Sequence, residues 1–138
     1  MIETYKINVK TKGHTDIIDI TKKVEEVIEK SKINNGIVCV FVKGSTASIS
    51  TLEYEPNLVK DMKEVLEKIA PENKYYHHHA TWGEDNGSAH IRACLMKPGI
   101  TIPFNNKRLF LGTWQQIVIL DFDTRARERE IIIQLIGE

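Results

Sequence analysis

Residues 114–137 read WQQIVILDFDTRAREREIIIQLIG, two apolar runs on either side of a charged turn. Both runs are rich in β-branched residues, and we expect them to form two strands paired around the turn TRAR. A hairpin, GITIPFNNKRLFLG at 99–112, is predicted just before them, with Asn105-Asn106 at its turn. Strands therefore dominate the C-terminal third, which indicates an α+β domain with a largely antiparallel sheet. The segment 131–136 is apolar on both faces, so it requires cover from a second sheet or from another subunit.

The N-terminal half adds four predicted strands and two helices. The alternation at 4–9 and the short run at 16–20 predict two strands, and the apolar run GIVCVFVKG at 36–44 predicts a buried strand followed by STASISTLEY as its partner. TKKVEEVIEKS at 21–31 predicts a helix with Thr21 as its N-cap. NLVKDMKEVLEKIAP at 57–71 predicts a second helix, which Pro71 closes.

These elements predict one domain over residues 1–138, with its strands either in one layer or divided into two packed layers. Residues 88–96, SAHIRACLM, fit either a short helix capped by Ser88 or a strand. No repeat or linker divides the chain.

The composition argues against several classes of partner. Lys and Arg together number 19, as do Asp and Glu, so the formal net charge is zero, which argues against bulk electrostatic binding of nucleic acid. No segment approaches transmembrane length and the N-terminus lacks a signal-peptide core, so we expect no membrane association and a cytoplasmic location. Cys39 and Cys94 lie in apolar surroundings that suit reduced thiols better than a disulfide.

Four of the five histidines lie in YYHHHATWGEDNGSAHIR, residues 75–92. Neutral imidazole is a good zinc ligand, and His90 could complete a pair with one of His77, His78 and His79. Consecutive residues of an extended loop point in different directions, so at most two of these three can face one ion. A polar loop with solvated histidines is an equally good interpretation of the spacing alone.

Polar side chains near His90 could support such a site. Asp85 and Asn86 could orient an imidazole, and Arg92 could hold a phosphate through two hydrogen bonds. Ordinary turn chemistry for the first two, and a surface position for the arginine, are the alternatives.

Two further segments are candidates for ligand binding. KGSTAS at 43–48 could form a small anion-binding concavity with Ser45, Thr46 and Ser48, although a hydroxyl-rich turn explains it as well. Trp114 and Gln115 follow a glycine at a strand start, which suits stacking on a planar ring, although tryptophan more commonly lies in a core.

Four segments in this order and spacing, GSTASIS…EYEP, IAPENKYYHHH, DNGSAHIRACL and LGTWQQIVILDFD, resemble the YjbQ family of secondary thiamine-phosphate synthases, in its archaeal-type branch. The resemblance runs from about residue 3 to the C-terminus. It implies an α+β fold, a two-layer β-sandwich with two main helices outside it, assembled as a homotrimer. The implied reaction joins a pyrimidine diphosphate to a thiazole phosphate and releases pyrophosphate.

The resemblance also implies roles for particular residues. The family's Tyr-x-His motif falls on Tyr76 to His78, which makes His78 the preferred metal ligand together with His90, and its acidic residue falls on Glu53. Its Asn falls on Asn86, its Ala-His-Ile-Lys/Arg on residues 89–92, and its Leu-Gly-Thr-Trp-Gln on residues 111–115. Many bacterial members have a histidine where this chain has Gly44, so one ligand could be missing here, or be replaced by His79, Glu53 or water.

We therefore expect an enzyme that acts on small phosphorylated metabolites with a divalent metal, most simply zinc, or magnesium with a diphosphate substrate. Its catalytic residues are expected to be His78, His90, Arg92 and Glu53, and its metal ligands His78, His90 and Asp85. The expected substrate-binding residues are Ser45, Thr46, Ser48, Asn86, Trp114 and Gln115. A metal-dependent phosphate hydrolase and a non-catalytic trimeric binding protein are the alternatives.

Overall fold

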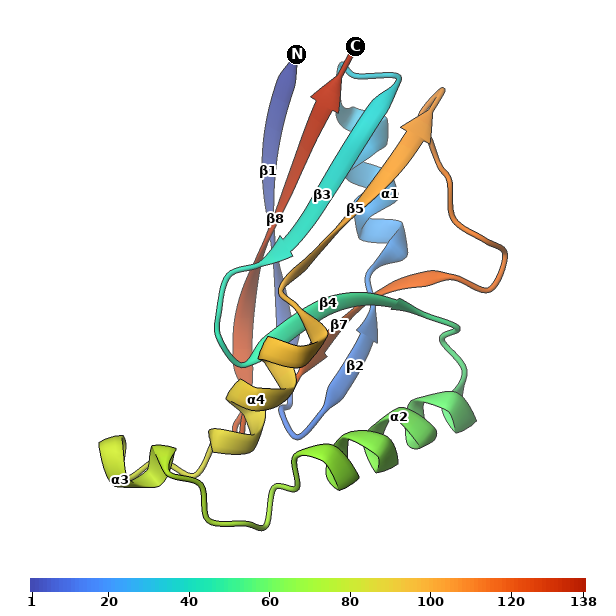
Figure 1. Cartoon of the computed structure of the whole chain (residues 1–138). Coiled ribbons are helices and arrows are strands. Elements are labelled where there is room, and N and C mark those ends of the chain that lie inside the picture. Colours follow the sequence, from blue (N-terminus) through green and yellow to red (C-terminus); the bar gives the residue numbers. More distant parts are fainter.

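The computed structural model describes all residues from Met1 to Glu138 and contains eight strands and four helices (Figure 1). The strands are β1 (Ile2–Thr11), β2 (Asp16–Asp19), β3 (Gly36–Val42), β4 (Ala47–Leu52), β5 (Gly99–Asn105), β6 (Arg108–Leu109), β7 (Gln116–Asp121) and β8 (Arg127–Gly137). The helices are α1 (Thr21–Lys30), α2 (Pro56–Ile69), α3 (His78–Trp82) and α4 (Gly87–Met96). None of the helices has the length and apolar character that crossing a lipid bilayer requires.

The strands form two antiparallel sheets. The larger sheet has the order β1-β8-β3-β5-β6 and the smaller one the order β2-β7-β4. A core of Val, Ile and Leu side chains from both sheets and from α1 fills the space between them. The fold is therefore the expected α+β two-layer sandwich.

The centre of the smaller sheet is buried on both faces. On β7, Ile117 and Ile119 belong to the core between the sheets, whereas Val118 and Leu120 pack under α2 and α4. Side chains alternate across a strand, so an uninterrupted apolar run such as IVIL is what a strand covered on both faces needs. The two longer helices thus cover the outer face of the β2-β7-β4 sheet.

Strand pairing differs from the prediction in two places. β7 and β8 do not pair with each other, because β7 lies between β2 and β4 while β8 lies between β1 and β3. β4 is not the partner of β3 either, since it pairs with β7 in the other sheet. In both cases the short connection carries the chain from one layer to the other, and periodicity along a strand contains no information about that step.

The positions of α1 and α2 are confirmed, but the residues predicted as N-caps are wrong. α1 and α2 lie where expected, and α2 ends before Pro71, but Ile20 and not Thr21 is the N-cap of α1. Residues 88–96 are helical, with Asn86 and not Ser88 at the N-cap position. The β5–β6 turn is one residue later than predicted, at Asn106 and Lys107, which both have positive φ.

The outward face of the larger sheet carries exposed apolar side chains. β8 buries Ile131, Ile133 and Leu135 in the core, while Ile136 on its other face is 46% exposed. Ile37 and Phe41 of β3, which neighbours β8, are also exposed on that face. The apolar character of 131–136 on both faces is therefore covered on one face only within a single chain.

Candidate functional site

α4 fixes the position of His90. Ala89 and Ala93 are buried against the smaller sheet, so the neighbouring His90 lies at the edge of that buried face. A Cβ atom at Gly87 would approach Cβ of Tyr76 to 2.6 Å, which shows how closely the histidine segment packs on the start of the helix. Tyr76 is also tied to the end of α2, because its hydroxyl donates to the carbonyl oxygen of Pro71 at 2.6 Å.

The histidine segment contains a short helix, α3, that the sequence did not predict. Because of this turn, His78 and His79 point in different directions. The ring of His78 lies edge-on to the ring of His90, with the two centroids 4.7 Å apart. His79 stacks instead on Tyr75, and its Nδ1 atom lies 3.0 Å from the carbonyl oxygen of Tyr76. Of the three consecutive histidines, His78 is therefore the one that faces His90.

His90 is held as a neutral imidazole. Burial lowers the pKa of His90 below its ordinary value, and the neighbouring His78 lowers it further. The charges of Asp123 and Glu84 act in the opposite direction, as does a hydrogen bond from the ring to the backbone of Ser45. A neutral ring retains a lone pair, which is the form that binds a metal or accepts a proton.

A cavity of about 260 Å³ joins His90 to the segment between β3 and β4. Ser45 and Cys94 face the same space as His90, and Cys94 is exposed. The lining residues are Gly44, Ser45, Ala47, His90, Ala93, Cys94 and Pro98. Part of the GSTAS segment and the histidine pair thus lie together, although they are far apart in the sequence.

The other two hydroxyls of that segment are committed elsewhere. Thr46 donates to the buried carboxylate of Asp123 at 3.1 Å and accepts from Arg129 at 2.6 Å. Ser48 is fully buried and donates to the carbonyl oxygen of Ala93 at 3.2 Å. Of the three hydroxyl side chains expected to bind substrate, only that of Ser45 lines the cavity.

A buried network of Asp and Arg side chains lies beside the GSTAS segment and is bonded to it through Thr46. Arg129 binds both oxygens of the Asp121 carboxylate, at 2.7 and 2.9 Å, and Arg127 binds Asp123 at 2.8 Å. Burial alone would raise the pKa of Asp123, but hydrogen bonds from the Thr124 backbone, Arg127 and Thr46 hold it below its usual value. The sequence pattern predicts only a charged turn, TRAR, between two strands here. Alternating Asp and Arg residues beside a buried strand were the available signal for this network.

Asn86 and Asp85 contact neighbouring residues at the end of β7, Asp123 and Thr124. The Nδ2 atom of Asn86 is 3.4 Å from Asp123, and its buried Oδ1 atom has no hydrogen-bond partner. Asp85 accepts from the Thr124 hydroxyl and lines another hollow, shared with His14, Glu72 and His79. Asp85 is therefore not placed with the His78–His90 pair.

Arg92 is directed away from the cavity. Its side chain is 2% exposed, and its Nε atom donates to the carbonyl oxygen of Ala70 at 3.0 Å. The other two guanidinium nitrogens donate to the Thr15 hydroxyl at 2.7 Å and to the Glu67 carboxylate at 2.8 Å. Because all three nitrogens are used, Arg92 joins α4 to the end of α2 and is not presented to a phosphate beside His90.

Glu53 and Trp114 line a separate hollow of about 390 Å³. The Trp114 side chain is 72% exposed there, not buried in the core. Gln115 supports this loop, since its side chain donates to Thr51 at 3.2 Å and accepts from the backbone of Gly112 at 3.0 Å. The remaining lining residues are Asp19, Tyr54, Glu55, Thr113 and Gln116.

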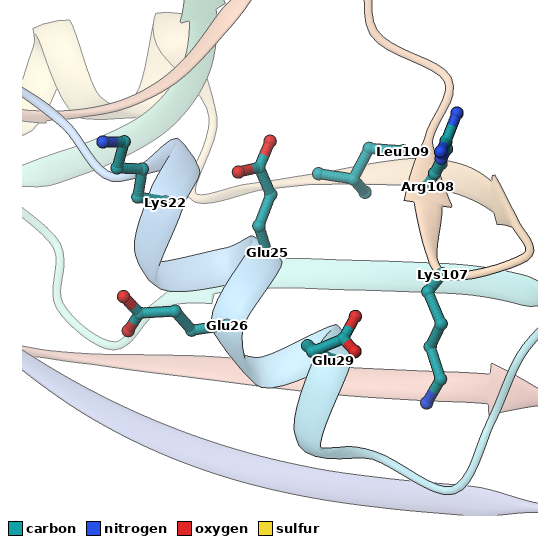
Figure 2. A pocket seen from close by; sticks show the side chains of 7 residues that line it. All are labelled: Lys22, Glu25, Glu26, Glu29, Lys107, Arg108 and Leu109. Carbon is teal, nitrogen blue, oxygen red and sulfur yellow. The ribbon is translucent and has the colours of Figure 1, made fainter.

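The largest hollow lies elsewhere, between α1 and the β5–β6 turn (Figure 2). Glu25 and Glu29 of α1 form one wall, and Lys107 and Arg108 the other. Lys107 is already used, since its ammonium group donates to the carbonyl oxygen of Ile28 at 3.1 Å near the end of α1. Lys107 caps α1, and no histidine lines this hollow. The hollow is therefore an open charged surface.

The residues of one chain do not complete a zinc site. No three His, Cys, Asp or Glu side chains form a group that could hold a metal ion. Zinc in catalytic sites has three protein ligands, and the His78–His90 pair offers two side chains at most. Any metal bound by this pair therefore needs a further ligand from outside the chain.

The fold and the site together define a class of protein: a two-layer antiparallel sandwich with a histidine pair beside the strand-connecting GSTAS segment. The chain belongs to the YjbQ family, because the model of the UPF0047 protein YjbQ-like family matches residues 5–138.

Relatives in both archaea and bacteria agree with this assignment. A UPF0047 protein of Methanothermobacter thermautotrophicus is 35% identical over 137 residues, covering 99% of this chain and 94% of that protein. The UPF0047 protein YugU of Bacillus subtilis is 30% identical, covering 99% of this chain and all of its own length.

Solved structures have the same fold. A protein of Aeropyrum pernix has a TM-score of 0.91 at 32% identity, with 99% of each chain covered. A YjbQ/UPF0047 family protein of Clostridium acetobutylicum has a TM-score of 0.87 at 32% identity, covering 96% of this chain and 99% of that one.

Proposed function

We propose that this protein is a secondary thiamine-phosphate synthase, which joins a pyrimidine diphosphate to a thiazole phosphate and releases pyrophosphate. The observation that carries the proposal is the shared cavity of His90 and Ser45, with His78 edge-on to His90. Ser45 offers a hydroxyl donor in this cavity and His78 an imidazole beside His90, which suits the oxygen atoms of a phosphate.

In the proposed reaction, the ring nitrogen of the thiazole attacks the exocyclic methylene carbon of the pyrimidine, and the bond from that carbon to the diphosphate oxygen breaks. No proton has to be removed from the thiazole nitrogen, so this step needs no general base from the protein. His78 and Ser45 would donate hydrogen bonds to the departing diphosphate and stabilise its developing charge. His90, whose ring is bonded to the backbone of Ser45, would hold that segment in position. Arg92 has no part in this step, because its guanidinium is committed to Glu67, Thr15 and Ala70. Magnesium bound to the diphosphate would enter as part of the substrate.

We also propose that the functional protein is a homotrimer and not a single chain. The exposed Ile37, Phe41 and Ile136 on the outward face of the larger sheet favour association, because burying apolar surface of this kind stabilises an interface. Light scattering at micromolar concentration is expected to give three times the mass of the 15.8 kDa chain.

The test is to incubate the purified protein with both substrates and magnesium and to measure thiamine phosphate and pyrophosphate. We expect both products in equal amounts, and their loss in the variants His78→Ala and His90→Ala. Replacing the exposed His77 with Ala is the matched control and should leave the rate unchanged.

A metal-dependent phosphate hydrolase is the second candidate. The neutral state of His90 favours it, because a neutral imidazole can accept a proton from an attacking water. Release of inorganic phosphate from the pyrimidine diphosphate alone, without thiamine phosphate, would replace the synthase with the hydrolase. Binding of a phosphorylated metabolite without turnover of either kind would identify the non-catalytic binding protein.

A further inference from the structure

Two hollows with different chemistry lie near the two ends of β4, because Ala47 lines one of them and Glu53, which follows the strand, lines the other. We call the first the imidazole wall, made of His78, His90, Ser45 and Cys94. The second is the carboxylate wall, made of Asp19, Glu53 and Glu55 with Tyr54 and Trp114. β4 has 6 residues, from Ala47 beside the first hollow to Leu52 directly before Glu53, so at about 3.3 Å per residue it separates the walls by about 20 Å. Side chains of the two walls cannot meet within one chain.

The imidazole wall has no carboxylate side chain, and the carboxylate wall has no basic side chain. No acidic side chain lines the cavity of the imidazole wall, and the chain neighbours of its ends, Lys43 and Lys97, are exposed. The carboxylate wall contains three carboxylates and no basic residue. The carboxylate wall is therefore negative, whereas the imidazole wall contains a neutral His90 and has the exposed Lys97 at one end. Lys43 is paired with Glu130 at 3.9 Å, and the charges of Asp123 and Glu84 also reach His90.

Within the carboxylate wall, Glu53 is the acidic residue that is free to act on a partner. The Asp19 carboxylate accepts from the backbone and hydroxyl of Thr21. The Glu55 carboxylate accepts from backbone N–H groups at the start of α2. The carboxylate of Glu53 has no hydrogen bond or ion pair within the chain, and it faces the same hollow as the exposed ring of Trp114.

Exposed apolar side chains accompany both walls. Ile91 and Leu95 lie on α4, the helix of His90, and Trp82 ends the helix of His78. Phe110 and Trp114 lie on the loop of the carboxylate wall. Large exposed apolar residues near a charged hollow are typical of surfaces that another protein chain covers.

We propose that the carboxylate wall of one copy of this chain faces the imidazole wall of the next, so that the functional site is built from two copies. This inference rests on the proposed function only for the identity of the substrate. Contact between two different surfaces of identical chains is head-to-tail, and such contacts generate closed rings, which a trimer satisfies. Glu53 then supplies the third ligand that the histidine pair of one chain lacks.

The native Cys94 allows a direct test, because it is exposed and lines the cavity with His90. In a Cys39→Ala background, Glu53→Cys or Trp114→Cys is treated with a short bis-maleimide and analysed on a denaturing gel. We expect covalent dimers and larger rings in which Cys94 of one copy is joined to the new cysteine of another. Adding Cys94→Ala should abolish them.

Glu64→Cys is the matched control, since Glu64 is an exposed acidic residue on α2 that lines neither hollow. It should remain uncrosslinked at the same protein concentration. Equal crosslinking at residue 64, or none at residues 53 and 114, would overturn the composite site. The readout requires no turnover, so a failure of the synthase assay leaves this result unaffected.

Discussion

The rings of His78 and His90 lie edge-on with their centroids 4.7 Å apart, although they belong to different helices. The close packing of Tyr76 on Gly87 holds these helices together, because no side chain fits between the tyrosine and the glycine. The pair is therefore built into the fold before any ligand is present.

The first prediction concerns zinc. Two imidazoles at this distance should bind zinc, and His78→Ala with His90→Ala should weaken its affinity at least tenfold, as measured by competition with a zinc-sensitive dye. His77→Ala should not change it, because His77 is exposed and does not face His90. Equal zinc affinity in the double variant would show that the pair is not the metal site.

The affinity should also depend on pH in a particular way. The pKa of His90 is lowered by burial and by His78, so His90 stays neutral somewhat below the ordinary histidine pKa of about 6.5. Protons compete with zinc for His90 only as the pH falls through that lowered value. Zinc affinity should therefore change little between pH 8 and 7 and fall steeply under acidic conditions.

The second prediction is that Arg92→Ala reduces stability and not phosphate binding. The change removes two buried hydrogen bonds, among them the one to the Thr15 hydroxyl, and a partly buried one to Glu67, whose carboxylate is 51% exposed and still accepts from the backbone of Glu72. We expect a loss of about 2–4 kcal/mol in the free energy of unfolding, measured with urea. A stable variant with tenfold weaker phosphate binding would instead return Arg92 to the site.

The third prediction concerns His14, which lies 3.0 Å from Glu72. A hydrogen bond from His14 to Glu72 raises the pKa of the histidine, against a smaller opposite effect of burial. The nearby Thr124 backbone and Asp85 also raise it. This contribution to stability is fully present below the ordinary histidine pKa of about 6.5 and is lost as the pH rises through the raised value.

His14→Asn tests this contribution, because Asn tolerates the positive φ of 53° at this position. The variant should lose more stability at pH 6 than at pH 8. Because the His14 side chain is 56% exposed, solvent screening limits the difference to about 1 kcal/mol or less. The control is His77→Asn at an exposed position, and a loss that is equal at both pH values would contradict the prediction.

The sequence predicted the elements of the fold better than their pairing. Strands such as β3 and β8 follow from the alternation or apolar runs of their own residues, so GIVCVFV and EREIIIQLIG were identified without the structure. Whether β4 pairs with β3 or crosses to the other sheet depends on contacts between distant segments. Local periodicity does not encode those contacts.

The same difference between local pattern and long-range contact applies to the candidate site. The choice of His78 came from a resemblance to the YjbQ family, and the close contact with His90 agrees with it. The direction of Arg92 could not be predicted, because it depends on where the end of α2 places Ala70 and Glu67. The separation of Glu53 and Trp114 from the histidines is likewise a property of the three-dimensional path of β4.

The last prediction concerns Gly44, where many bacterial members of the family have a histidine. A Cβ atom at residue 44 would lie 2.7 Å from a terminal nitrogen of Arg129, which is shorter than a normal contact. The end of an arginine side chain can usually move, but the bonds from Arg129 to both oxygens of the Asp121 carboxylate and to Thr46 fix this one. We therefore expect Gly44→Ala to destabilise the protein by about 1–3 kcal/mol, the usual cost of inserting a methyl group into a filled site. Arg129→Lys shortens the side chain and removes the nitrogen that lies against residue 44, so in this background Gly44→Ala should cost less. A double-mutant cycle by urea denaturation measures this coupling between the two positions. Additive losses would show that Arg129 does not exclude a side chain at residue 44, and the positive φ of 158° at this position would then account for the glycine.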